Sequence, residues 1–580
     1  MKKRILTFVL SLVMILSCVS ALAFAEGNAV VATENWYTEA DTLYIRNASD
    51  LLAFASVLYD GHTTGNEFEG KTVYLCNDIV LNTGDASTWG TTPPTNSYNS
   101  FKGGSSTGWF KGTFDGQGHV ISGLYQKVTG SGVGFIPYTS ESATIKNVTI
   151  ANSYFECAKT DGGLASAVTC EYKSPTTEGA CFAIENVHVK DTHVIGNYGV
   201  AGVLAFMNTF SVKNVQVKMN NITFVGGKIE GGPQSGGIIG RIYHGGTTAA
   251  YENGVTMNMD KIVVDSTLTF TNSSETDNVN AGGVIGHVSG FRKIDMTNIM
   301  VNGSLTIVGN KEGSTPFIGH VTSSATTQGT VDGVDEVATI NISNAVAVAQ
   351  LTNVRAYLCT RQVYHEEHPI VKMTNIRSDK EKVTEGADNI GRKVQDGKND
   401  TYPSGSEHKY STAELQGENS VALFDGWMIT GENSYPIPTA RPARLLGYQT
   451  TYKADVTDEN DATETYSVRL IAALNDDFYT FAGFDNISIT YTDNGEQTKE
   501  KATYYCQYAY TSVIGVDKDG EEETYNASDY GATRLIALVI TGIPESVTEF
   551  EITLNAFAGN GNVSIAGLTK TVEISAVQAQ

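Results

Sequence analysis

Hydrophobic and polar positions between residues 114 and 376 follow two short patterns that alternate along the chain. In the first, a glycine precedes two apolar residues, a small residue, a variable residue and usually a further apolar one, as in residues 202–207 (GVLAFM). In the second, apolar residues alternate around an asparagine, as in residues 184–189 (IENVHV). The glycine pattern occupies residues 134–138, 163–168, 202–207, 237–242, 283–288 and, as a variant, 317–321; the asparagine pattern occupies 145–150, 184–189, 212–217, 296–301, 340–346 and 373–376.

Short strands that recur at uneven spacing are typical of a β-solenoid, in which loops of free length join stacked coils. One such strand cannot bury its apolar face alone, but stacked coils merge their alternate Val and Ile residues into a continuous core. Equal register would also place Asn on Asn, so we expect an amide hydrogen-bond ladder. We expect the glycines to supply a positive φ at the bends.

The flanking regions follow other patterns. Residues 49–61 predict a helix that begins at Ser49 and ends at Gly61. An apolar strand over 72–81 and a polar loop over 82–112, with Trp89, Tyr98, Trp109 and Phe110, come next. Residues 26–100 are therefore assigned to an N-terminal cap and first strand, 101–438 to the solenoid with an irregular closing edge over 377–438, 439–446 to a linker, and 447–580, with alternating strands and Asp-Gly or Asn-Gly turns, to a β-sandwich-like domain.

The first 25 residues look like a secretion signal. A basic start at residues 1–4 is followed by an apolar run, and Ala23-Phe24-Ala25 fits a cleavage site. Residues 16–18 (LSC) weakly resemble a lipoprotein cleavage site, which is the alternative. The sequence predicts an exported protein.

Charge narrows the choice of partners. The chain of 580 residues has a formal net charge of −24. Such a surface repels phosphate backbones and anionic lipid, so we expect neither nucleic acid nor a membrane surface as a partner. No segment after the leader has the ~18 apolar residues of a membrane span.

One stretch supports a family resemblance. Residues 110–124 (FKGTFDGQGHVISGL) resemble the opening coil of bacterial surface proteins that carry the GLUG motif, named for its occurrence in immunoglobulin A peptidases. The resemblance extends over residues 43–438. It implies an all-β fold with a right-handed parallel β-helix on an exported bacterial protein. Residues 468–472 (VRLIA), 483–484 (GF) and 540–544 (ITGIP) are similar to a module that closes many secreted proteins of Gram-positive bacteria.

Motifs for metal chemistry are weak. The peptidases that give the GLUG motif its name use zinc bound by His-Glu-x-x-His on a helix. This chain has only His365-Glu366-Glu367-His368, followed by Pro369. The cysteines after the leader have no ligand spacing; some of Cys157, Cys170 and Cys181 could pair, or all could be buried thiols. Neither the acidic calcium ligands of pectate lyases nor the clustered Asp residues of polygalacturonases are evident. We expect no metal and no cofactor.

Alignment of the glycine patterns predicts one row of outward side chains at the variable position. The row holds Tyr138, Ala167, Phe206, Arg241, His287 and His320. Aromatic rings can stack on sugar faces while guanidinium and imidazole groups donate to hydroxyls, so the row is a candidate glycan site; the alternative is an ordinary solvated face. Trp89 and Trp109 are further candidates, with packing at the end of the core as their alternative.

Together these patterns predict a monomeric, non-enzymatic, adhesin-like protein that is secreted or held at the cell surface. It would bind a glycan or another host or extracellular ligand through Tyr138, Phe206, Arg241, His287, His320, Trp89 or Trp109. The alternative is a polysaccharide-degrading enzyme, a lyase or a glycoside hydrolase, on the same scaffold.

Overall fold

A computed structural model describes two compact units, residues Ala29–Pro438 and Thr439–Gln580. In the first unit the description covers residues 41–438 except 60–67, 99–108, 118, 131, 160–161, 174, 209–211, 244–253, 273–278, 323–327, 332–333, 363–369, 383–388, 393–407, 425–426 and 428–434. In the second unit it covers the backbone of strands β32 to β41.

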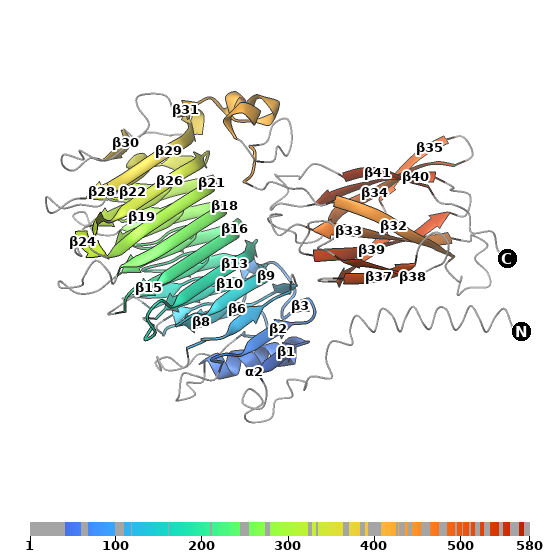
Figure 1. The fold of residues 1–580 in the computed structure, drawn as a ribbon, viewed down its shortest axis with the longest axis horizontal. Coiled ribbons are helices and arrows are strands. Elements are labelled where there is room, and N and C mark those ends of the chain that lie inside the picture. The colour runs from blue at the N-terminus through green and yellow to red at the C-terminus, as the bar shows by residue number, and fades with distance from the viewer. Residues whose placement is uncertain are drawn as a thin grey trace, which may run out of the picture. The chain divides into compact units, whose positions relative to one another are not determined.

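The first unit is built from parallel strands that stack from β1 and β2 at one end to β29 and β31 at the other (Figure 1). The larger sheet, here called sheet A, has 17 strands. They are β1 (Thr42–Ile45), β2 (Thr72–Leu75), β3 (Ile79–Val80), β4 (Thr113–Asp115), β5 (Val120–Ser122), β6 (Tyr125–Val128), β9 (Thr144–Ala151), β10 (Tyr154–Cys157), β13 (Cys181–Lys190), β14 (His193–Gly196), β16 (Gln216–Gly231), β18 (Val255–Asn272), β21 (Phe291–Gly309), β26 (Thr339–Ala347), β27 (Gln350–Thr352), β29 (Ile370–Asp379) and β31 (Lys409–Tyr410).

A second parallel sheet, sheet B, has eight strands. They are β8 (Ile136–Thr139), β12 (Thr169–Tyr172), β15 (Leu204–Asn208), β17 (Ile239–Tyr243), β20 (Ile285–Ser289), β23 (Ile318–Thr322), β28 (Ala356–Gln362) and β30 (Asn389–Arg392). Shorter elements are the pairs β7 (Gly132–Val133) with β11 (Leu164–Ala165), β19 (Ala281–Gly282) with β22 (Ser314–Thr315) and β24 (Gln328–Val331) with β25 (Val334–Val337), and the 3-10 turns η2 (Ala86–Thr88), η4 (Lys380–Lys382), η5 (Thr412–Glu414) and η6 (Gly417–Leu423).

One hydrophobic core runs through the first unit. Apolar residues of both sheets occupy it in vertical stacks, for example Ile184 on Met219 in sheet A and Met207 on Ile242 in sheet B. Each strand buries its inward side chains against the next coil, as the alternation of Val and Ile predicts. The prediction of an all-β fold with long parallel sheets is therefore confirmed.

The asparagine ladder exists, with one change of member. Asn186 Nδ2 donates to Asn147 Oδ1 at 3.0 Å, and Asn221 Nδ2 donates to Asn186 Oδ1 at 3.0 Å. The next coil has Lys261 in the same left-handed conformation, and a second ladder starts where Asn344 donates to Asn298. Asn221 replaces the predicted Asn214, because the register between β13 and β16 pairs Glu185 with Asn220 and Val187 with Ile222, which sets Asn221 beside Asn186.

The prediction that the repeated glycines supply positive φ is wrong. The left-handed residues are the asparagines, with φ of 55° at Asn147 and 53° at Asn186, whereas Gly202 and Gly237 do not have positive φ. A Cβ on Gly202 would overlap the Gly237 carbonyl oxygen, and a Cβ on Gly237 would overlap that of Gly283. These glycines are needed because consecutive coils approach closely.

Helix α2 (Ala48–Tyr59) lies at the N-terminal end of the first unit (Figure 1). Asn47, one residue before the helix, accepts the Asp50 N–H at 3.0 Å, so it and not the predicted Ser49 acts as the N-cap. Phe54 packs its ring against those of Phe68 and Phe114, at centroid distances of 5.3 and 5.8 Å. The predicted strand over 72–81 is divided into β2 and β3.

The second unit consists of antiparallel sheets. One sheet has the order β32 (Arg444–Lys453), β33 (Thr465–Leu474), β39 (Arg534–Pro544), β36 (Thr503–Ala509), and another the order β35 (Glu496–Lys501), β34 (Phe484–Asp493), β40 (Glu549–Ala556), β41 (Leu568–Glu573). Strands β37 (Ser512–Val516) and β38 (Glu522–Asn526) pair with each other.

Candidate functional site

The predicted row lies on sheet B, with one member exchanged. Register pairs place Tyr138 beside Glu171, Glu171 beside Phe206, Phe206 beside Arg241, Arg241 beside His287, and His287 beside His320. None of these side chains belongs to the hydrophobic core cluster. Sheet B therefore arranges one outward row of two aromatic rings, a carboxylate, a guanidinium group and two imidazoles.

Ala167 does not belong to the row. Its N–H donates to the carbonyl oxygen of Gly202, so it stands beside the glycine of the next coil. In this coil the position of the repeated glycine is taken by Ala167 itself, four residues after Gly163. The outward position therefore falls on Glu171.

The side chains at both ends of the row are buried, whereas those in the middle are partly exposed. Tyr138, His287 and His320 are 6%, 6% and 4% exposed, while Phe206 and Arg241 are half-buried. The alternative interpretation, an ordinary solvated face, therefore does not describe the end residues. A ligand has access to the middle of the row, where Phe206 and Arg241 lie.

Arg241 is the centre of this middle part. Its guanidinium carbon lies 4.0 Å from the ring centroid of Tyr243 and 5.6 Å from that of Phe206. Its Nη1 donates to the Tyr198 hydroxyl at 3.0 Å, and that hydroxyl donates to Gln234 Oε1 at 2.5 Å. These contacts fix the orientation of the guanidinium plane, which makes it a preformed donor group.

Glu171 forms a separate pair at the Tyr138 end. Its carboxylate lies 2.7 Å from Lys173 Nζ, and Lys173 also lies over the Tyr138 ring at 5.0 Å. Burial raises the pKa of Glu171, although the positive charge of Lys173 opposes that shift. Because both charges are paired, this end of the row has a structural explanation.

His287 and His320 stack at the other end. Their ring centroids are 5.2 Å apart and the ring planes differ by 14°. Burial, together with the positive charges of His320 and Arg241, holds the pKa of His287 well below its usual value. His287 is therefore neutral at physiological pH.

Neither tryptophan joins the row. Trp89 is 3% exposed and packs edge-on against Tyr125 at 6.3 Å, in a small cluster with Ala86 and Tyr154. Its ring is closed to a ligand, so packing explains it. Trp109 is half-buried, and its Nε1 has no hydrogen-bond partner among the described residues. The segment His365–His368 lies outside the described residues, while Cys76, Cys157, Cys170 and Cys181 are free thiols.

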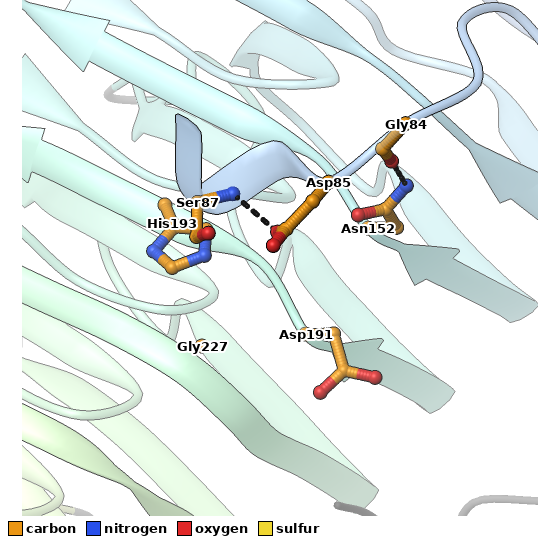
Figure 2. Close-up of a pocket in the computed structure, with 7 residues that line it drawn as sticks. All are labelled: Gly84, Asp85, Ser87, Asn152, Asp191, His193 and Gly227. Carbon is orange, nitrogen blue, oxygen red and sulfur yellow. Dashed lines mark hydrogen bonds between the residues drawn. The ribbon is translucent and has the colours of Figure 1, made fainter. Parts of the chain in front are cut away.

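Sequence patterns missed a second site, an open depression of about 640 Å³ beside sheet A. It is lined by Gly84, Asp85, Ser87, Asn152, Asp191, His193 and Gly227 (Figure 2). Asn152 holds the loop in place, because it donates to Gly84 O at 2.7 Å and accepts from Ala86 N at 3.0 Å. Trp89 assists by anchoring the same loop on Tyr125.

The pKa values of the two carboxylates in the depression are shifted in opposite directions. Hydrogen bonds from the backbone and side chain of Ser87 lower the pKa of Asp85. Burial raises the pKa of Asp191, the positive charge of Lys190 opposes the shift, and the charge of Asp85 adds to it. Burial and the charge of Lys228 lower the pKa of His193, whose buried Nδ1 has no hydrogen-bond partner in the described part of the chain.

No protein-family model, curated protein or solved structure matches this chain. Among the described residues, no group of three or more His, Cys, Asp or Glu side chains is placed to hold a metal ion. The part of the chain that the structure describes contains no helix long and apolar enough to cross a membrane.

Proposed function

We propose that this protein is a non-enzymatic binding protein that acts outside the cell and recognises a glycan through the middle of the row on sheet B. The observation that carries the proposal is the half-open cluster of Phe206, Arg241 and Tyr243. The Phe206 and Tyr243 rings are nearly parallel, with centroids 6.3 Å apart and 29° between their planes. Arg241 lies against both rings.

Such a cluster suits a sugar, which has apolar C–H faces and hydroxyls at its edge. An aromatic ring accommodates the face, and a guanidinium group with fixed orientation donates to the hydroxyls. Parallel strands repeat about every 4.8 Å, so the row presents its groups along a line that a linear polymer can follow. A peptide strand is less suitable, because the row is interior to sheet B and offers no free sheet edge.

A glycan array tests this function. The protein without residues 1–25 is labelled and screened, and the same screen is run with Tyr243→Ala and Arg241→Gln. Each lost contact is worth about 1 kcal/mol or more, so each variant is expected to bind at least about fivefold more weakly. Arg292→Gln is the matched control, because Arg292 bonds Asn214 and belongs to sheet A. Equal binding by all three variants would reject the row as the site.

The same proposal includes the finer architecture and the location. The helix Ala48–Tyr59 would cap a right-handed β-helix of the GLUG-motif kind, and the two four-stranded antiparallel sheets after residue 443 would form a β-sandwich. Support comes from the phenylalanine cluster around Phe54 and from the antiparallel strand pairing. The basic and apolar N-terminal leader supports export from a bacterial cell.

A second candidate function, polysaccharide cleavage, is favoured by the depression of Figure 2. Asp85 and Asp191 face it, and their environments separate their pKa values as the acid and base of a glycoside hydrolase require. Asp191 would be the protonated acid and Asp85 the ionised partner. Release of reducing ends from polysaccharides by the native protein, and its loss in Asp191→Asn, would establish this activity; Asp295→Asn is the control, because Asp295 lies on β21 and does not line the depression.

A further inference from the structure

The depression beside sheet A has acidic walls. Of the seven described residues that line it, Asp85 and Asp191 are acidic and none is Lys or Arg. The side chain of Asp85 is exposed, and hydrogen bonds from the backbone and side chain of Ser87 lower its pKa. This carboxylate is therefore ionised at neutral pH and accessible to a ligand.

The histidine of the depression adds no positive charge. Burial, together with the charge of Lys228, lowers the pKa of His193, so its imidazole is neutral at neutral pH. A neutral imidazole exchanges hydrogen bonds with hydroxyl groups but does not offset a carboxylate.

The two nearest lysines leave one negative charge without compensation. Lys190 acts on Asp191 and Lys228 acts on His193 through their charges, but neither lysine lines the depression. Lys228 Nζ lies 3.0 Å from Glu230 Oε1, and Lys190 directly precedes Asp191 in the chain. Asp85 makes no ion pair with another described residue. Its charge therefore dominates the open part of the depression.

This charge restricts the sugars that the depression accepts. A uronate or another anionic unit would place a second negative charge beside Asp85, and like charges brought together in a site select against a ligand. We propose that the polysaccharide recognised in the depression is uncharged, and that Asp85 determines this specificity. The inference rests on the second candidate function, polysaccharide cleavage, and names its substrate class.

The other lining groups suit an uncharged sugar. The Asp85 carboxylate accepts hydrogen bonds from hydroxyls, and the Ser87 hydroxyl and the His193 imidazole exchange hydrogen bonds with them. The volume of about 640 Å³ falls within the range of about 300 to 1,000 Å³ that is usual for small-molecule sites. Because the depression is open, it does not require a free chain end.

An uncharged substrate also restricts the cleavage chemistry. Cleavage by β-elimination needs a carboxylate on the sugar to make the neighbouring C–H acidic, and an uncharged sugar has none. In hydrolysis the glycosidic C–O bond breaks and Asp191 gives its proton to the leaving oxygen, with Asp85 as the ionised partner. Water supplies the hydroxyl at the anomeric carbon and the proton that restores Asp191, so neither product contains a new double bond.

Matched polymers test the substrate class. Each pair shares a backbone and differs in charge: methyl-esterified and de-esterified homogalacturonan, xylan without and with glucuronic acid side groups, and hydroxyethyl and carboxymethyl cellulose. The protein without residues 1–25 is incubated with each polymer at constant ionic strength, and reducing ends and unsaturated sugars are measured. We expect reducing ends from the uncharged member of at least one pair, severalfold fewer from its charged partner, and no unsaturated sugars.

Binding measurements then locate the specificity. Asp191→Asn is used as the background, because it should leave the polymer intact, and affinities for the two members of the cleaved pair are measured by calorimetry. Adding Asp85→Asn should narrow the difference between them by about two- to fivefold, as expected for one exposed charge. Asn at this position can still accept the Ser87 N–H that begins the turn η2, so the loop should keep its structure.

Glu185→Gln in the same background is the matched control. It removes one negative charge from β13 at a residue that does not line the depression. An equal narrowing by Glu185→Gln and Asp85→Asn would show that only net charge matters and would overturn the role of Asp85.

Two other outcomes separate the inference from the function on which it rests. Preferred cleavage of the charged polymers, or release of unsaturated sugars, would overturn the uncharged-substrate assignment and leave polysaccharide cleavage intact. Cleavage of none of the six polymers would reject the second candidate function, and the inference with it.

Discussion

Two stacks of polar side chains run along the first unit, and they differ in how their hydrogen bonds are used. In the asparagine ladder of sheet A, Asn186 donates to the coil before it and accepts from the coil after it. In the row of sheet B, Arg241 and His287 leave buried nitrogen atoms unused. Both stacks arise in the same way, from the repetition of a residue position in successive coils.

The difference separates structural repetition from a candidate binding site. An inner ladder member such as Asn186, which is bonded to the coils on both sides, stabilises the stack and needs no ligand. A stack that keeps donors without partners lowers stability, and natural proteins retain such groups mainly where they have a function. Repetition alone is therefore a weak indicator of a site, whereas unused hydrogen-bonding capacity is a stronger one.

The largest effect is expected in the ladder, from Asn186→Ala. The substitution removes two side-chain hydrogen bonds, each worth about 1 kcal/mol, and places alanine in the left-handed region, which costs about 1 kcal/mol more. We expect the free energy of unfolding of the first unit to fall by about 3 kcal/mol in urea titrations followed by circular dichroism.

Asn197→Ala is the matched control for this variant. Asn197 is exposed, makes one side-chain hydrogen bond to Lys159 O and does not have a positive φ. Its replacement should cost less than about 1 kcal/mol. Similar losses in the two variants would contradict a special role of the ladder.

Sequence periodicity predicted that the coils stack on one another, and it predicted most members of the row on sheet B. Because the glycine pattern marks the same point in each coil, it placed Phe206, Arg241, His287 and His320 in one register. It misplaced Ala167, because that coil substitutes alanine for glycine and the pattern then matches four residues too early. It also misassigned Asn214, whose local sequence resembles that of the true ladder member, Asn221.

Burial and the depression could not be predicted in the same way. Exposure of His287 depends on the packing around the row, which a one-dimensional pattern does not contain. The depression combines a loop residue, Asp85, with Asn152 and Asp191 from two later coils. One signal was present in the sequence: an Asn or an Asp directly follows each of two strands. These residue types tolerate the left-handed conformation well, and Asn152 and Asp191 adopt it, with φ of 42° and 49°.

A smaller effect is expected for the pH dependence of stability. The pKa of His287 is lowered in the folded state by burial and by the charges of His320 and Arg241, so the unfolded chain binds the proton more readily. The stability that depends on a neutral His287 is fully present above the ordinary histidine pKa of 6.5. It is lost as the pH falls below that value toward the lower pKa of the folded state. Native protein should therefore lose more stability between about pH 7.5 and about pH 5 than His287→Phe does.

Thermal unfolding of the native protein and of His287→Phe across this pH range measures the difference in stability. Contributions from His193 and His408 cancel in that difference, because both proteins contain these residues. Burial, with a further contribution from the charge of Lys409, lowers the pKa of His408 to about 4, so it acts in the same direction. Parallel curves for the two proteins would mean that His287 does not titrate differently on folding.

The smallest effect on stability is expected for the residue with the largest expected effect on binding. Arg241→Gln removes two cation–π contacts and one hydrogen bond to Tyr198, which together stabilise a half-buried side chain by an amount on the order of 1 kcal/mol. It also removes the buried Nε without a partner and the positive charge beside His287, and both changes favour the folded state. Since these effects oppose each other, the net change in unfolding free energy should stay below about 1 kcal/mol, while glycan binding weakens severalfold. A loss as large as that of Asn186→Ala would show that Arg241, like the ladder, serves the fold, and the contrast between the two stacks would then disappear.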